Sequence, residues 1–160
     1  MMSEPNVDIE NLGASKYRLT ASVTLSRPRR EVFAFFSNAH NLEMITPGFL
    51  NFRILTPAPI EMREGAKIDY RLRLHGIPIK WHTNISAWQP DERFVDEQTR
   101  GPYRYWHHEH LFDDADHQTV MTDVVNYSVW LGAIVHPLVV KKDLLRVFGY
   151  RQDRILRLFG

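Results

Sequence analysis

Apolar and polar residues alternate along most of residues 17–129, which is the pattern of half-buried β-strands. In residues 66–74, for example, Ile68, Tyr70 and Leu72 are separated by charged residues. Gly, Pro and Asp mark most of the short links between the later segments, which indicates antiparallel neighbours. The alternation predicts a sheet of about seven strands, at residues 17–25, 52–55, 66–74, 79–88, 93–99, 104–112 and 118–129.

Helical spacing replaces this alternation in two places. Ser26-Arg27-Pro28 is a helix start signal, and a second short helix after Asn38 must stop near Thr46-Pro47. The longest helix is predicted over residues 138–159, with apolar residues on one face and most of the Lys and Arg residues on the other. Residues 1–15 are polar and aperiodic, so we expect a flexible N-terminal arm followed by one domain over residues 16–160.

Composition narrows the function classes. The chain has 160 residues, 44% of them hydrophobic and 24% charged, which suits one globular domain. A net charge of +1 predicts no nucleic-acid partner, and the absence of Cys excludes disulfides and thiolate chemistry. The first residues lack an apolar run and no uncharged stretch is long enough to span a bilayer, so we expect a cytoplasmic protein without membrane insertion.

Ionisable and aromatic residues are mixed in the segment FVDEQTRGPYRYWHHEHLF, residues 94–112. It carries Asp96, Gln98, His108 and His110. Burial of unpartnered polar groups costs roughly 2–7 kcal/mol, so such a cluster lines a cavity or forms a satisfied network. The segment predicts a ligand pocket.

Strand register places one histidine between two carboxylates. If residues 101–103 form the turn, Asp96 faces His108, and if Phe112 faces Thr119 across the next loop, His108 also faces Asp123. Carboxylates on both sides would orient the imidazole and raise its pKa. This arrangement predicts either a buried network or an acid/base group.

A metal site is the alternative for the same residues. His108 and His110 lie two residues apart on one strand face, and Asp96 or Asp123 would supply a third ligand. We predict no metal, because short His-rich tracts match by chance and these aspartates can simply orient the rings. No nucleotide-binding or GxSxG motif is present, so no cofactor is expected.

The order of elements, a strand, two short helices, six strands and a long helix, resembles the helix-grip fold of the SRPBCC or START-like superfamily. The resemblance covers about residues 16–159 and is carried by EVFAFFSNAHNLEMITP, LNFRILTPAPIEMREGAKIDYRLRLHGIPIKW, FVDEQTRGPYRYWHHEHLF and MTDVVNYSVWLG. It implies an α+β fold in which a curved antiparallel sheet wraps the C-terminal helix around an apolar cavity. The bacterial polyketide cyclase/dehydratase-like members range from enzymes to carriers, and no invariant catalytic motif transfers to this chain.

The function predicted first is the binding or carriage of a small, largely apolar organic molecule. An acid/base enzyme of the cyclase, dehydratase or aldol type using His108 and Asp123 is the alternative. A second alternative is a lipid- or partner-interaction module on Trp130 to Lys142, which equally suits a cavity gate or a packed loop. A partner enzyme or a homodimer stays open. The predicted ligand-binding residues are Tyr70, Trp81, Asp96, Gln98, Trp106, His108, His110, Asp123, Tyr127 and Phe148.

Overall fold

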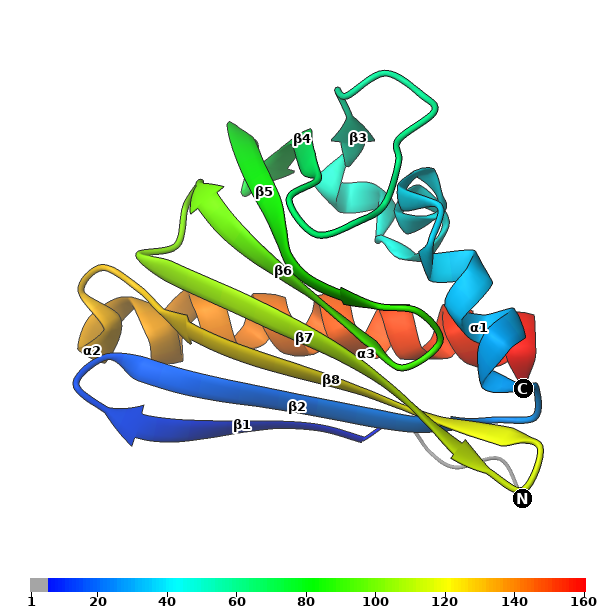
Figure 1. Ribbon diagram of the computed structural model, residues 1–160. Coiled ribbons are helices and arrows are strands. Elements are labelled where there is room, and N and C mark those ends of the chain that lie inside the picture. Colours follow the sequence, from blue (N-terminus) through cyan, green and yellow to red (C-terminus); the bar gives the residue numbers. More distant parts are fainter. Residues whose placement is uncertain (1–5) are drawn as a thin grey trace.

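A curved antiparallel sheet wraps around the C-terminal helix in the computed structural model, which describes residues 6–160 (Figure 1). The strand order is β1-β2-β8-β7-β6-β5-β4-β3. The strands are β1 (Asn6–Gly13), β2 (Lys16–Leu25), β3 (Arg53–Ile54), β4 (Lys67–Leu74), β5 (Ile77–Gln89), β6 (Arg93–Arg100), β7 (Tyr105–Ala115) and β8 (Gln118–Ser128). This architecture confirms the predicted helix-grip α+β fold.

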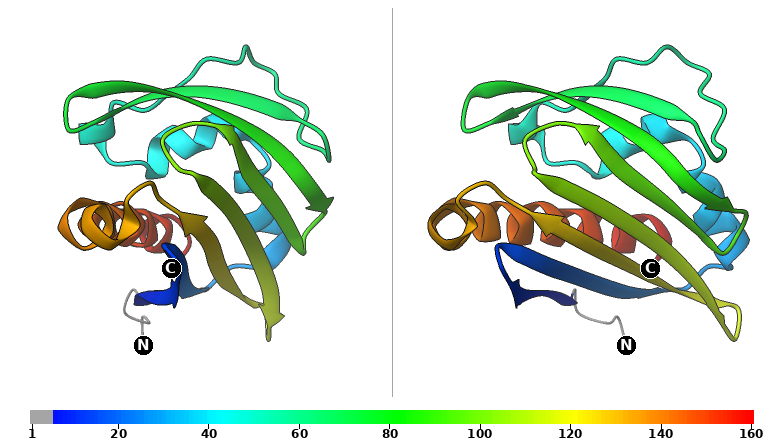
Figure 2. Two further views of the ribbon diagram at one scale, coloured as in Figure 1. Left: turned by 90° about the vertical axis from the view of Figure 1, so that its left-hand side faces the viewer. Right: turned by 60° about the vertical axis from the view of Figure 1, so that its left-hand side comes forward.

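The helices lie on the concave side of the sheet. Figure 2 shows the longest helix end-on inside the curve of the strands. The helical segments are α1 (Arg29–Phe36), the 3-10 helices η1 (Ala39–Ile45) and η2 (Gly48–Leu50), α2 (Gly132–Val135), the π-helical η3 (His136–Val140) and α3 (Lys141–Phe159). No helix within residues 6–160 is both long enough and apolar enough to span a membrane.

Strand β1 corrects the prediction of a flexible arm over residues 1–15. Residues Asn6–Gly13 form an edge strand that pairs antiparallel with β2, so the sheet has eight strands rather than about seven. Val7 and Ile9 pack on the core, while the other side chains of β1 are exposed. The alternation of Val7 and Ile9 with polar residues is a strand signal, but it is short and lies among polar residues, so the sequence analysis treated it as aperiodic. Residues 1–5 of the predicted arm lie outside the described part of the chain.

The predicted pairing of β6 with β7 is confirmed, because Asp96 faces His108. The predicted pairing of β7 with β8 is wrong by two residues. Asp116 and His117 form a tight turn in the left-handed region, so Phe112 faces Met121 and not Thr119. A shift of two residues keeps the same side chains on the same face, because side chains alternate with a period of two.

The C-terminal helical region begins earlier than predicted, at Gly132 rather than residue 138. It passes through α2 and η3 before α3, and the apolar face of α3 is buried against the sheet. Beside the C-terminal end of α3, Phe33 of α1 packs against Phe94 and Phe112 and fills the space under the sheet. The other half of the concave side is therefore the half left open for a cavity.

Candidate functional site

A cavity of about 430 Å³ lies between the concave face of the sheet and helix α3. This volume is within the range of roughly 300–1,000 Å³ that is typical of small-molecule sites. Most of the lining is apolar and aromatic, with Asp96, His108, His110 and Arg151 together at one end and His75 and Asp143 at the rim. The lining includes Ile68, Tyr70, Leu72, Trp81, Ile85, Asp96, Tyr103, Trp106, His108, His110, Val140, Leu144, Val147, Phe148 and Arg151.

Seven of the ten predicted ligand-binding residues line this cavity. They are Tyr70, Trp81, Asp96, Trp106, His108, His110 and Phe148. Asp123 and Tyr127 are buried but do not line the cavity. Gln98 lies elsewhere, because its side-chain amide donates to the carbonyl of Tyr103 and accepts from the same residue's N–H, closing the β6–β7 turn. Contact with a ligand stays a prediction for all ten.

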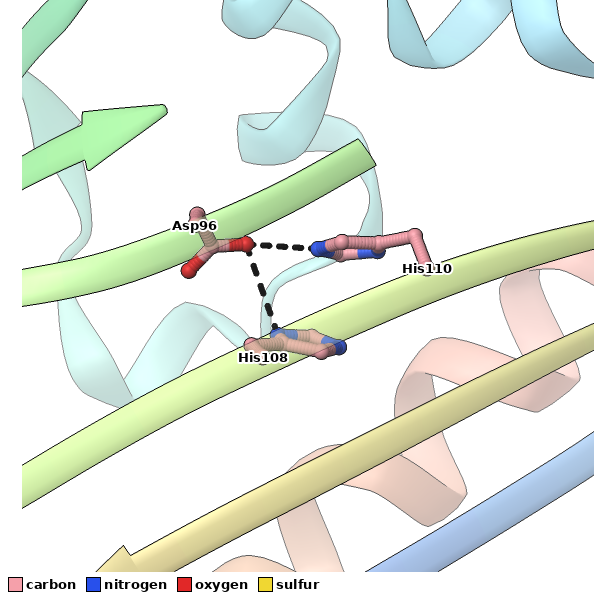
Figure 3. Close-up of side chains that lie close together, drawn as sticks. All are labelled: Asp96, His108 and His110. Atoms are coloured by element: carbon pink, nitrogen blue, oxygen red, sulfur yellow. Dashed lines mark hydrogen bonds and ion pairs between the residues drawn. The ribbon is translucent and has the colours of Figure 1, made fainter. Parts of the chain in front are cut away.

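Two stacked histidines and two carboxylates form the polar end of the cavity. The rings of His108 and His110 lie 3.7 Å apart on β7. His108 Nε2 lies 2.8 Å from Asp123 Oδ1, and His110 Nε2 lies 2.5 Å from Asp96 Oδ2. His110 Nδ1 lies 3.1 Å from Asp123 Oδ1. His108 Nδ1 lies 3.6 Å from Asp96 Oδ2, and Figure 3 shows the carboxylate of Asp96 facing both rings. His108 thus contacts both carboxylates, but the predicted register behind this was wrong, because Asp123 faces His110 and not His108 across the strands.

Arg151 joins this network from helix α3. Its Nη2 atom lies 3.6 Å from Asp123 Oδ1, and its guanidinium lies over the rings of Phe36 and Phe148. The sequence analysis missed this residue because it assigned most cations of the helix to the exposed face. The signal was present, since Arg151 is seven residues after Leu144 and three after Phe148, both on the apolar face.

The two histidines have pKa shifts of opposite sign. Burial lowers the pKa of His108, and the neighbouring His110 lowers it further, which together outweigh the carboxylates. This contradicts the predicted rise for His108. Burial also acts to lower the pKa of His110, but its hydrogen bonds to Asp123 and Asp96 dominate and the pKa is raised. Both nitrogens of His110 face carboxylate oxygens, so we assign it as the charged ring.

Both carboxylates are ionised. Burial acts to raise the pKa of Asp96, but His108 and His110 lower it by more. Burial likewise acts to raise the pKa of Asp123. The charge of Arg151 and, to a smaller extent, the hydrogen bonds of His108 and His110 outweigh burial, so the pKa of Asp123 lies well below the usual value. Two negative charges therefore face two positive ones, on His110 and Arg151, while His108 is neutral. The 3.3 Å contact between Arg151 Nη2 and His110 Nδ1 joins two donors, so their shared acceptor is Asp123.

Asp96, His108 and His110 could also hold a metal ion, since one ligand atom from each lies within 4.8 Å of the others. Their present arrangement favours a proton-bearing network. The Nε2 atom of His110 bonds to Asp96, and a metal would have to displace that proton beside the charged Arg151. The metal site remains the less favoured alternative.

A second polar cluster holds the segment that follows β8. The side chain of His136 in η3 is buried, stacks on Tyr17 at 3.5 Å and has its Nε2 atom 2.7 Å from the hydroxyl of Tyr127. Burial and then the charge of Lys141 lower the pKa of His136, so the neutral ring accepts the hydrogen bond from Tyr127. The sequence analysis missed this role of His136, although a lone His in an apolar stretch was the available signal.

The predicted interaction segment from Trp130 to Lys142 forms part of the cavity rim. Trp130 and Val139 line the cavity, and the side chains of Trp130, Leu131, Ile134 and Leu138 are exposed on α2, η3 and the residues before them. Across the rim, His75 Nε2 in the β4–β5 turn lies 2.8 Å from Asp143 Oδ2 of α3. The segment is thus largely helical and borders the cavity, while its role as a gate or as an interaction surface stays a prediction.

Comparison with known proteins places the fold. No protein-family model matches the chain, and no curated protein is a significant relative. Among solved structures, protein Ms6760 from Mycobacterium smegmatis is 16% identical, with a TM-score of 0.67 over 96% of this chain and 97% of that one. The Zhui aromatase/cyclase from Streptomyces sp. R1128 is 12% identical, with a TM-score of 0.68 over 89% and 93%.

A plant protein has the same architecture. The ginseng major latex-like protein 151 from Panax ginseng is 13% identical, with a TM-score of 0.64 over 89% of this chain and 99% of that one. The aromatase/cyclase and the latex-like protein are SRPBCC helix-grip proteins. At these identities the likeness concerns the fold. The chain therefore has the helix-grip fold, as its sequence predicted.

Proposed function

We propose that this protein binds a small, largely apolar organic molecule in the cavity between the sheet and α3. The observation that carries the proposal is an apolar cavity of about 430 Å³ that ends at a buried, charge-balanced polar cluster. Apolar burial contributes about 25 cal/mol per Å² and would supply most of the affinity. The few polar groups would fix the orientation of the ligand.

A fluorescence titration with the planar hydrocarbon pyrene tests the proposal. Pyrene is expected to bind the wild-type protein, and Leu72→Trp is expected to abolish binding because this buried residue of β4 lines the cavity. Arg71→Trp is the matched control, since Arg71 is its exposed neighbour on the opposite face of the same strand. Failure of pyrene to bind, or equal binding to both variants, would contradict the proposal.

Proton transfer at a carbonyl-bearing substrate is the second candidate function. One observation favours it. The neutral His108 lines the cavity, and its Nε2 atom is hydrogen-bonded to Asp123, which does not line the cavity. A carboxylate that orients an imidazole in this way is a common acid/base arrangement. An aromatase/cyclase among the proteins of this fold is compatible with the same reading.

The exchange of α-protons of 2-tetralone in D₂O, followed by NMR, tests this second candidate without the natural substrate. The exchange rate should rise with pH through the lowered pKa of His108, because only the neutral ring accepts a proton, and then level off. His108→Asn should abolish the catalysed exchange. A protein that gives the background rate at every pH would leave only the binding function.

A further inference from the structure

The polar end of the cavity offers hydrogen-bond acceptors that no group of the described residues uses. Asp96 lines the cavity, and its side chain is 16% exposed. Its Oδ2 atom faces His110 Nε2, whereas its Oδ1 atom has no hydrogen-bond partner within residues 6–160. An ionised carboxylate only accepts hydrogen bonds, so Oδ1 calls for a donor from a bound molecule.

His108 supplies a second free acceptor beside Asp96. Its Nε2 atom faces the ionised Asp123 and therefore carries the ring's proton, which leaves Nδ1 as a bare lone pair. Nδ1 lies 3.6 Å from Asp96 Oδ2, beyond hydrogen-bond distance, and both atoms are acceptors. A ligand with a hydrogen-bond donor at this position would therefore meet acceptor atoms, on His108 and on Asp96.

The charge balance of the cluster limits what this donor can be. Asp96 and Asp123 are balanced by His110 and Arg151, which all lie at this end of the site. A ligand ammonium or carboxylate would add an uncompensated charge in a buried place, which is unfavourable by several kcal/mol. A neutral hydroxyl adds none. It can also accept a hydrogen bond, which suits the nearby guanidinium of Arg151.

We propose that the cavity selects neutral hydroxylated apolar molecules, whose O–H group donates to Asp96 Oδ1 at the end of the cavity that His108 also lines. This inference rests on the proposed binding function and deepens it by naming the ligand class. The apolar body would lie along Trp106 and Phe148, with the hydroxyl at the carboxylate–histidine end.

Three probes of nearly equal size test the proposal at pH 7: 1-hydroxypyrene, 1-methoxypyrene and pyrene-1-carboxylate. The hydroxyl compound should bind about tenfold or more tightly than the methoxy compound, because a hydrogen bond to a charged group is lost when the donor is methylated. The carboxylate should bind more weakly than both. Fluorescence titration of the full chain measures all three dissociation constants.

Asp96→Asn should reduce the preference for hydroxyl over methoxy to about threefold or less, because the charged acceptor is removed. Unchanged binding of pyrene to Asp96→Asn would establish that the cavity of this variant is intact. Glu97→Gln is the matched control, since this neighbour does not line the cavity and should keep the full preference. If Asp96→Asn fails to fold, the ligand comparison on the wild-type protein still decides.

The outcomes separate this inference from the binding function. Equal affinity for the hydroxyl and methoxy probes would overturn the hydroxyl selection and leave the cavity function standing. No binding of any probe, pyrene included, would overturn both. A preference that persists undiminished in a folded Asp96→Asn protein would overturn the assignment to Asp96.

Discussion

The two ends of the cavity are built in opposite ways. At the polar end, His110 of β7 and Arg151 of α3 converge on the buried Asp123 of β8, and Asp96 of β6 contacts the two histidines. At the rim, apolar side chains such as Trp130 and Leu138 are exposed, and the contact of His75 with Asp143 across the opening is open to solvent. We therefore expect stability to depend more on the buried polar end than on the exposed side chains of the rim.

Asp123→Ala should give the largest effect. It leaves the charges of His110 and Arg151 buried without their shared partner, and breaking such a network typically costs about 3–5 kcal/mol of stability. Urea unfolding measures the change. Asp113→Ala, at an exposed position of β7, should stay within about 0.5 kcal/mol of the wild type. Similar losses of unfolding free energy in the two variants would show that the buried network is no more important for stability than an exposed surface position.

Tyr127→Phe should have the next largest effect. The variant leaves the buried Nε2 atom of His136 without its donor, and an unsatisfied buried group costs about 1–3 kcal/mol. The amides of residues 132–140 should then exchange faster with deuterium. Tyr105→Phe removes a hydroxyl from an exposed ring of β7 and serves as the control. Unchanged exchange in Tyr127→Phe would contradict the anchoring role of His136.

The pH dependence of stability should show the charge on His110. Its folded pKa is raised above the ordinary 6.5, so its contribution is complete below pH 6.5 and is lost as the pH rises through the folded value. His108 and His136 have lowered pKa values, so their effects on stability fall below pH 6.5 and do not overlap with that of His110 above pH 6.5. Unfolding free energies between pH 6.5 and 9 should fall for the wild type and fall less for His110→Gln. A level wild-type profile would mean that His110 is neutral in the fold.

Trp130→Ser should have the smallest effect on stability, within about 0.5 kcal/mol, because the side chain is 64% exposed. Its ring lies against the guanidinium of Arg104, at 5.2 Å from the ring centre. Thermal unfolding of the variant beside Trp106→Ser gives the contrast, since Trp106 is buried among the rings of Trp81, Tyr103 and Tyr127. A comparable loss in both would show that the rim is part of the core.

The sequence predicted the strands and the pocket because these depend on local alternation. Asp96, His108 and His110 were found because ionisable groups on an apolar strand face stand out. The register of β7 and β8 was not predictable, since the two-residue turn at Asp116 and His117 could not be told from a longer loop. The pKa of His108 is lowered first by burial and then by the charge of His110, and how deeply His108 is buried depends on helix α3 packing over the sheet, which local sequence does not give.

Residues contributed by distant segments were the hardest to foresee. Arg151 reaches the network from a helix far along the chain, and His136 finds Tyr127 and Tyr17 across the sheet. Strand β1 was missed for a different reason, because its alternation is short, with Val7 and Ile9 as the residues that face the core.

The ion pair between His75 and Asp143 bears on how fast a ligand would come and go. It links the β4–β5 turn to the start of α3 across the cavity rim, and the side chain of His75 is 63% exposed. Such a pair stabilises a contact by about 0.2–1 kcal/mol, so separating it slows exchange by no more than about fivefold. The residence time of a bound molecule would then depend mainly on the apolar surface that dissociation exposes to water. Salt would change this residence time only slightly.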